Sequence, residues 1–79
     1  MMKRLYSPRP VSVFTGDGGD PDEVAGRRVA AIREQWVVED GWWGGRPQCR
    51  RYFELVLEDG SDVVVFLEQR SGRWFRQRA

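Results

Sequence analysis

The pattern of apolar and polar residues is clearest between residues 50 and 66, where two apolar runs flank the dipeptide Asp59-Gly60. Both runs are rich in β-branched and aromatic residues, the residue types that favour strands. Asp-Gly between two such runs is a strong signal for a β-hairpin with a two-residue turn. Because neighbouring residues of a strand point to opposite faces, both faces of this hairpin are predicted to be apolar.

A two-residue turn would fix which residues of the hairpin lie opposite each other. The predicted cross-strand pairs are Phe53 with Phe66 and Leu55 with Val64 on one face, and Tyr52 with Leu67 and Val56 with Val63 on the other. A second turn over residues 69–72 adds a third strand, with Phe75 opposite Phe66 and Trp74 opposite Leu67. One of the two apolar faces of this meander must be covered by the N-terminal half of the chain or by another molecule.

The N-terminal half begins with a weaker pattern. Residues 11–14 alternate after Pro10, which predicts a short first strand. Residues 15–20 hold three glycines and two aspartates, a composition typical of a loop.

Residues 20–39 fit two interpretations. Asp20-Pro21 followed by two acids is typical of a helix N-terminus, which leaves a short helix within 21–35 as an alternative. Gly26 interrupts such a helix, however, and the residues after it alternate with a period of two. One side of that alternation holds Ala30, Ile32, Trp36 and Val38. We favour a short strand, a turn at Ala25-Gly26 and a long strand.

Composition agrees with a single domain over residues 1–79, in which residues 1–8 are expected to be poorly ordered. The chain is 41% apolar and 13% aromatic, enough to bury a small core. The sequence therefore predicts an all-β, mainly antiparallel fold of five or six strands. These strands would form a curved sheet or a partly open barrel that ends in the three-strand meander.

Candidate chemistry is sparse. Cys49 is the single cysteine and the chain has no histidine, so neither an internal disulfide nor a Cys/His metal set can form. No nucleophile and base are recognisable as a pair, so we expect no catalytic residues, no metal and no cofactor. The N-terminus lacks the apolar stretch of a signal peptide or membrane span, and we expect a cytoplasmic protein without membrane contact.

Several short motifs occur in a distinctive order along the chain. They are Arg9-Pro10-Val11, Gly26-Arg27, Trp42-Trp43, Arg51-Tyr52-Phe53, Asp59-Gly60 and Gly72-Arg73-Trp74. As an ordered set over about residues 9–76 they resemble the small C-terminal domain of ImuB-like Y-family DNA polymerase relatives, a domain that also occurs as free-standing bacterial proteins. The resemblance implies a non-catalytic accessory role in bacterial translesion DNA synthesis during the DNA-damage response.

Two surfaces are candidates for binding. A protein-interaction module, whose partner is a second copy of the chain in a homodimer or a polymerase-associated protein, would use apolar residues of the second face and of the loop before the hairpin. We place this interaction set at Trp42, Trp43, Tyr52, Val56, Val63 and Trp74.

The alternative is a small nucleic-acid-binding module. Trp36, the other tryptophans and Tyr52 would stack on unpaired bases, and arginines would hold the phosphates. The arginines concerned are Arg46, Arg50, Arg51, Arg70 and Arg73. Cross-strand ion pairs of Glu68 with Arg51 and Arg73 would equally explain part of this set.

Overall fold

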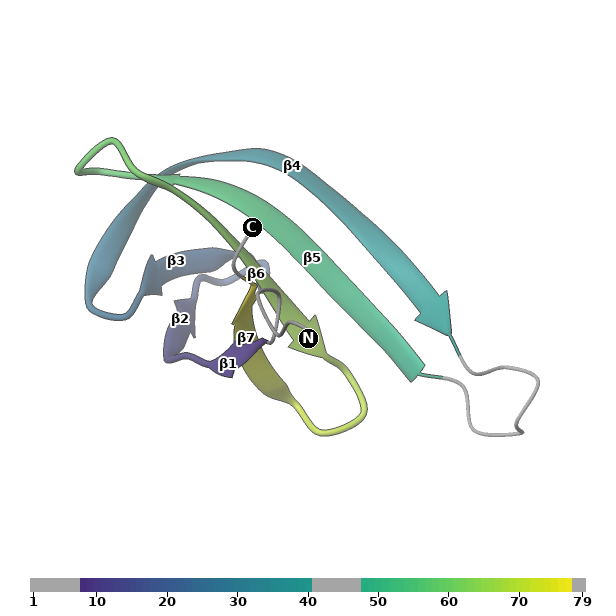
Figure 1. Cartoon of the computed structure of the whole chain (residues 1–79). Helices are drawn as coiled ribbons and strands as arrows, with labels where there is room; N and C mark the ends of the chain where they lie inside the picture. The colour runs from purple at the N-terminus through teal and green to yellow at the C-terminus, as the bar shows by residue number, and fades with distance from the viewer. Residues whose placement is uncertain (1–7, 41–47, 78–79) are drawn as a thin grey trace, which may run out of the picture.

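The computed structural model describes residues 8–40 and 48–77, which form one antiparallel sheet. Its strands are β1 (Arg9–Pro10), β2 (Val13–Thr15), β3 (Pro21–Val24), β4 (Arg27–Asp40), β5 (Gln48–Leu57), β6 (Asp62–Glu68) and β7 (Arg73–Gln77). Their order across the sheet is β1-β7-β6-β5-β4-β3-β2, and the long β4 and β5 arch over the short strands (Figure 1). The predicted all-β, mainly antiparallel fold is confirmed, with seven strands in place of five or six.

The ambiguous stretch of residues 20–39 is a short strand, a turn and a long strand, as favoured from the sequence, and the helix alternative is wrong. The turn joins β3 to β4 through Ala25 and Gly26, whose φ angles are 51° and 82°. A two-residue turn with positive φ at both positions matches the twist of the flanking strands. Gly26 adopts that conformation freely because it has no side chain.

The hairpin of β5 and β6 forms where predicted, but its register is one residue away from the prediction. Phe53 lies opposite Val65, and Leu55 lies opposite Val63. The connecting loop has three residues, because the Leu57 N–H donates to the Ser61 carbonyl at 2.9 Å. Gly60, at φ 89°, takes the left-handed position that ends this loop type. A slip of one residue exchanges the faces of β6, so the predicted pairs of Phe53 with Phe66 and Val56 with Val63 are wrong.

Asp59 holds this loop together. Its Oδ1 accepts hydrogen bonds from the Ser61 hydroxyl at 2.6 Å and the Ser61 N–H at 2.9 Å. Its Oδ2 lies 2.8 Å from Nη1 of Arg27. The Ser61 hydrogen bonds, with a smaller effect from the charge of Arg27, hold the pKa of the Asp59 carboxyl below its usual value of 3.8. The folded pKa is therefore below the unfolded one, so the stability that Asp59 contributes is present above about pH 4 and is lost as the pH falls through the folded pKa.

Ser61→Ala tests this account of the loop. Removing the hydroxyl donor should raise the pKa of Asp59 toward its usual value, because the largest cause of the lowering is gone. An NMR titration of the Asp59 carboxyl carbon measures the change. Ser12→Ala, at an exposed position outside the loop, is the matched control and should leave the Asp59 pKa unchanged. An unchanged pKa in Ser61→Ala would contradict the role of the hydroxyl.

The third strand of the meander pairs as predicted. Phe66 lies opposite Phe75, and Leu67 lies opposite Trp74. The four-residue connection ends at Gly72, whose N–H donates to the carbonyl of Glu68 at 2.8 Å. The register of β6 with β7 is thus confirmed although that of β5 with β6 is not.

The face of the sheet that carries Phe53, which we call the inner face, holds the core. Its buried members are Val24, Phe53, Leu55, Leu57, Val63 and Val65. Five partly buried residues pack against them, namely Val11, Val13, Val29, Ile32 and Trp74. Four of these five belong to the N-terminal half, which therefore covers the inner face of the meander from within the chain.

The sheet is curved so strongly that its two ends are joined by one short segment. The predicted strand over residues 11–14 is instead divided, because Val11 and Ser12 lead from β1 at one end of the strand order to β2 at the other. The Val11 N–H donates to the Trp74 carbonyl of β7 at 3.1 Å, and the Ser12 carbonyl accepts from the Ala25 N–H at 2.8 Å. Each residue of this crossing is thereby bonded to a different end of the sheet, an arrangement that suits a partly open barrel.

Two irregularities in β4 change which of its residues face the core. Its register with β5 shifts between Val29 and Ala31, and again between Ile32 and Glu34. Each shift leaves one residue without an opposite partner and breaks the period of two. Ile32 consequently packs against the core, whereas Trp36 contacts Tyr52 on the other face. The prediction that Ala30, Ile32, Trp36 and Val38 share one side is therefore wrong.

Candidate interaction surface

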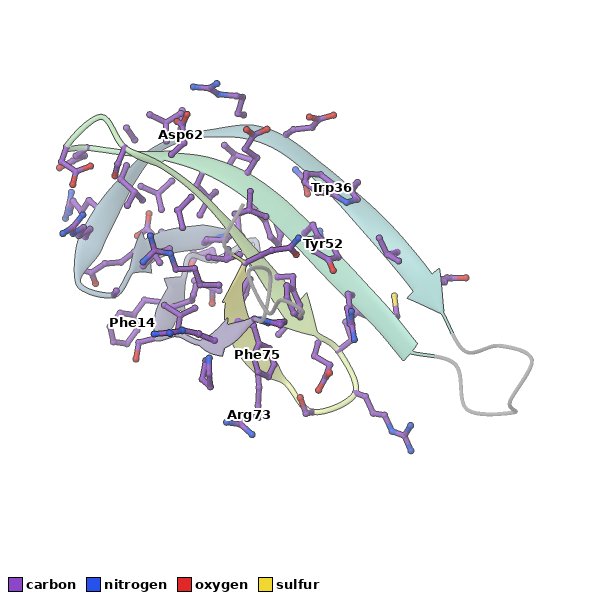
Figure 2. All side chains as sticks on the ribbon, in the orientation of Figure 1. Phe14, Trp36, Tyr52, Asp62, Arg73 and Phe75 are labelled. Carbon is purple, nitrogen blue, oxygen red and sulfur yellow. The ribbon has the colours of Figure 1, made fainter. Side chains whose placement is uncertain are left out.

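The outer face of the sheet, opposite the core, carries four aromatic residues from four neighbouring strands. Trp36 lies opposite Tyr52, Tyr52 opposite Phe66, and Phe66 opposite Phe75. The distances between neighbouring ring centroids are 5.3, 4.9 and 5.3 Å in that order. Figure 2 shows Trp36 and Tyr52 side by side on β4 and β5. We call these four residues the aromatic row.

Burial varies along the aromatic row. Phe66, in the middle, is 2% exposed, and its neighbours Tyr52 and Phe75 are half-buried. Trp36, at the β4 end, is 39% exposed. The rings therefore cover one another in the middle of the outer face, while the end at β4 stays open.

The open end continues into exposed apolar residues of the same strand. Val38, 37% exposed, follows Trp36 on the outer face, and Val37, 55% exposed, lies between them on the inner face, opposite Arg51. Single exposed apolar residues are ordinary, but three in a row along one strand, two of them on the same face, are typical of an interaction site. We call residues 36–38 the apolar patch.

Three arginines lie over aromatic rings. The guanidinium carbon of Arg50 is 5.3 Å from the ring centre of Phe66, that of Arg73 is 5.7 Å from Phe75, and that of Arg51 is 5.4 Å from Phe53. A cation over a ring face is attracted by the electrons of the ring. The guanidinium groups of Arg50 and Arg73 therefore help to cover the aromatic row.

The predicted ion pairs of Glu68 do not form in the described residues. Arg51 lies opposite Leu67, while Arg50 and Arg73 lie opposite Glu68 on its two sides. The Glu68 carboxylate accepts a hydrogen bond from the Ser71 hydroxyl at 2.7 Å. Within residues 8–40 and 48–77 the ion pairs are Arg27 with Asp59 and Arg33 with Asp62, at 2.8 and 3.3 Å. For Arg51 the correction follows from the register of β5 with β6, which sets it on the inner face. Arg73 lies opposite Glu68 as predicted, but its guanidinium lies over the ring of Phe75.

The predicted interaction set is divided by the sheet. Tyr52 and Val56 lie on the outer face, whereas Val63 is buried in the core and Trp74 packs against it, 5.7 Å from Phe53. The remaining predicted residues Trp42, Trp43 and Arg46 lie outside the described residues, and Arg70 is exposed in the turn before β7. The outer-face residues that the interaction set missed are Trp36 and Val38 at its open end, because alternation over an unbroken β4 puts them on the same side as Ile32.

The described residues contain neither a grouped set of metal ligands nor a membrane-spanning helix. No three side chains of His, Cys, Asp or Glu are grouped there in a way that would hold a metal ion. No helix in that part of the chain is long and apolar enough to cross a membrane.

The geometry of the outer face thus combines a covered row of rings, an open end at Trp36 and flanking arginines. Comparisons with protein-family models, curated proteins and solved structures gave no match to this chain.

Proposed function

We propose that this chain is a non-catalytic protein-interaction module that binds through the apolar patch at the open end of the aromatic row. The carrying observation is the run of Trp36, Val37 and Val38, exposed by 39%, 55% and 37%. Interface centres are enriched in aromatic residues and depleted of charge, and tryptophan is frequent among the residues that dominate binding energy. The resemblance to the small domain of ImuB-like polymerase relatives supports a partner in bacterial translesion DNA synthesis.

The packing of the aromatic row favours a protein over a nucleic acid as the partner. The rings of Trp36 and Tyr52 are 6° from parallel and 5.3 Å apart, so each ring already covers one face of the other. Proteins that stack unpaired bases present open ring faces. In this row the open face belongs to Trp36, at the end next to the apolar patch.

One observation favours nucleic-acid binding as a second candidate function. Nε of Arg50 is buried and has no hydrogen-bond partner among the described residues. Arg73 lies on the same face, across Glu68 from Arg50. Neither of the two ion pairs among the described residues involves Arg50, so its guanidinium can take an anionic group such as a phosphate. This candidate predicts that Arg50→Gln weakens binding and that the affinity falls with salt.

A binding experiment separates the two candidates. The chain is titrated with an ImuB-like polymerase and the other proteins of its mutasome, and separately with single-stranded DNA across a salt series. We expect saturable binding to one of these proteins and no salt-dependent quenching by DNA. Trp36→Glu should weaken the protein binding by about thirtyfold, the effect of a central tryptophan.

Phe14→Glu is the matched control, because Phe14 is also an exposed aromatic, at 66%, but belongs to β2. It should leave the binding unchanged. Equal losses in the two variants would contradict the apolar patch as the interface. DNA binding that Arg50→Gln weakens, without binding to any of the proteins, would replace the proposal by the second candidate.

A further inference from the structure

Among residues 8–40 and 48–77, no strand lies beside one edge of β4 over most of its length. β4 runs for 14 residues from Arg27 to Asp40, but β3 pairs with it at Arg27 and Arg28 alone. From Val29 onward, β5 is the one strand beside β4 in the part of the chain that the structure describes. Figure 1 shows β4 as the outer strand of the arch along this stretch. A free edge presents backbone N–H and C=O groups that can pair with another strand.

The two halves of this free edge differ in how well they are protected. The register shifts near Ala30 and Arg33 lie in the first half, and bulges of this kind discourage the pairing of an edge with another strand. From Glu34 onward the pairing with β5 is regular. This regular half contains the apolar patch, with no charged residue between Glu34 and Glu39. The unprotected part of the edge thus coincides with the exposed apolar residues.

We propose that this edge pairs, antiparallel and in a twofold arrangement, with the same edge of a second copy of the chain, with Trp36 opposite Trp36. This inference rests on the proposed function and names a second copy of the chain as a partner of the apolar patch. Twofold homodimers join the same surface of both copies, so the strand must be complementary to itself. The sequence of β4 meets this condition in one register.

In the register centred on Trp36, the aromatic rows of the two copies meet at the open ring faces of their tryptophans. The row of four rings in each copy then becomes a row of eight across the joined sheets. Gln35 lies opposite Val37 of the second copy, and Glu34 lies opposite its Val38. Apolar side chains of each copy are thereby covered by the stems of polar ones, as at the border of many interfaces.

Charge is compatible with the same register. Between Arg33 and Glu39 no two like charges come directly opposite each other in the two copies, and Glu34 lies opposite an apolar residue. The Arg33 guanidinium keeps its ion pair with Asp62, 3.3 Å away on the outer face of its own copy. A register centred on Val37 would set Trp36 against Val38, which separates the rings of the two copies.

The interface is a short edge, so the dimer should form reversibly and depend on concentration. We expect sedimentation equilibrium of the full chain to show a monomer–dimer equilibrium at protein concentrations from about 1 µM to about 1 mM. This range covers micromolar to millimolar dissociation constants. Val37→Lys places a charge on the edge and should raise the dissociation constant at least about tenfold. Phe14→Lys, at the β2 edge, is the control and should change nothing. A monomer at all concentrations, or a dimer insensitive to Val37→Lys, would overturn the proposal.

The register is read by oxidation of single cysteines. Trp36→Cys, Val37→Cys and Val38→Cys are each made with Cys49→Ser, and their folding is checked by circular dichroism. Directly opposite positions approach closely enough for a disulfide, whereas positions displaced along the strands do not. Trp36→Cys should therefore form the cross-linked dimer fastest. Faster cross-linking of Val37→Cys or Val38→Cys would overturn the proposed register.

The experiments distinguish a failure of the proposed dimer from a failure of the proposed function. A strict monomer whose binding to a mutasome protein still depends on Trp36 would remove the second copy as partner and leave the interaction module standing. A dimer with the expected register that binds none of those proteins would support this inference while removing the link to translesion synthesis.

Discussion

Phe53→Ala is expected to remove a large part of the folding stability of the domain. Phe53 is 1% exposed in the centre of the core, and its ring lies 5.7 Å from that of Trp74, the residue through which β7 packs on the core. Truncating a buried phenylalanine costs about 3–5 kcal/mol of unfolding free energy, because the lost burial and the remaining cavity both count. A chain of 79 residues has a total of about 4–12 kcal/mol at typical values per residue. The loss is thus at least about a quarter of the whole stability of the fold.

Urea unfolding followed by circular dichroism measures this loss, with Phe14→Ala as the matched control. Phe14 carries the same side chain at 66% exposure, so its truncation should change the unfolding free energy by no more than about 0.5 kcal/mol. Similar unfolding free energies for the two variants would contradict the assignment of the inner face as the core.

The strands themselves could be predicted because their signals are local. The turn at Ala25-Gly26 and the runs on both sides of Asp59-Gly60 carry the composition of strands and turns in a few residues each. The pairing of Phe66 with Phe75 was predictable for the same reason, since a four-residue connection sets it. These features need no knowledge of contacts far along the chain.

The register of β5 with β6 was not predictable from the Asp-Gly pair alone. That dipeptide suits a two-residue turn, but it also suits a three-residue loop in which glycine takes the last position. The choice depends on Ser61, whose hydroxyl and N–H both donate to Asp59 and draw the loop one residue wider. A difference of one loop residue then decided which side chains of β6 are in the core.

The candidate site could not be predicted from the sequence because β4 contains two shifts of register. Pattern reasoning continues a period of two along a strand, and no residue type in β4 marks a bulge. The two register shifts set Ile32 against the core and Trp36 on the opposite face, where the latter joins the aromatic row. Had the register of all three strand pairs been known, the sequence would have shown Trp36, Tyr52, Phe66 and Phe75 as opposite neighbours.

The aromatic row also stabilises the fold, and Phe66→Ala is expected to show it. Phe66 is 2% exposed although it lies on the outer face, because Tyr52, Phe75 and the guanidinium of Arg50 cover its ring. Its truncation should cost about 3–5 kcal/mol, as in a core, and should also remove two ring contacts. Urea unfolding gives the free energy, and near-ultraviolet circular dichroism reports the loss of order among the rings.

Trp36→Ala is the matched control in the same row. Among the described residues its ring has one aromatic neighbour, and it is 39% exposed. The loss should therefore be clearly smaller than at Phe66, with about 0.5–1.5 kcal/mol from the aromatic pair and the rest from the buried part of the ring. A large cost at Phe66 with a small one at Trp36 means that the middle of the outer face serves the fold, which leaves Trp36 free for binding. Equal costs would contradict that division, because Trp36 would then be part of the packing and its variants could not report on an interface alone.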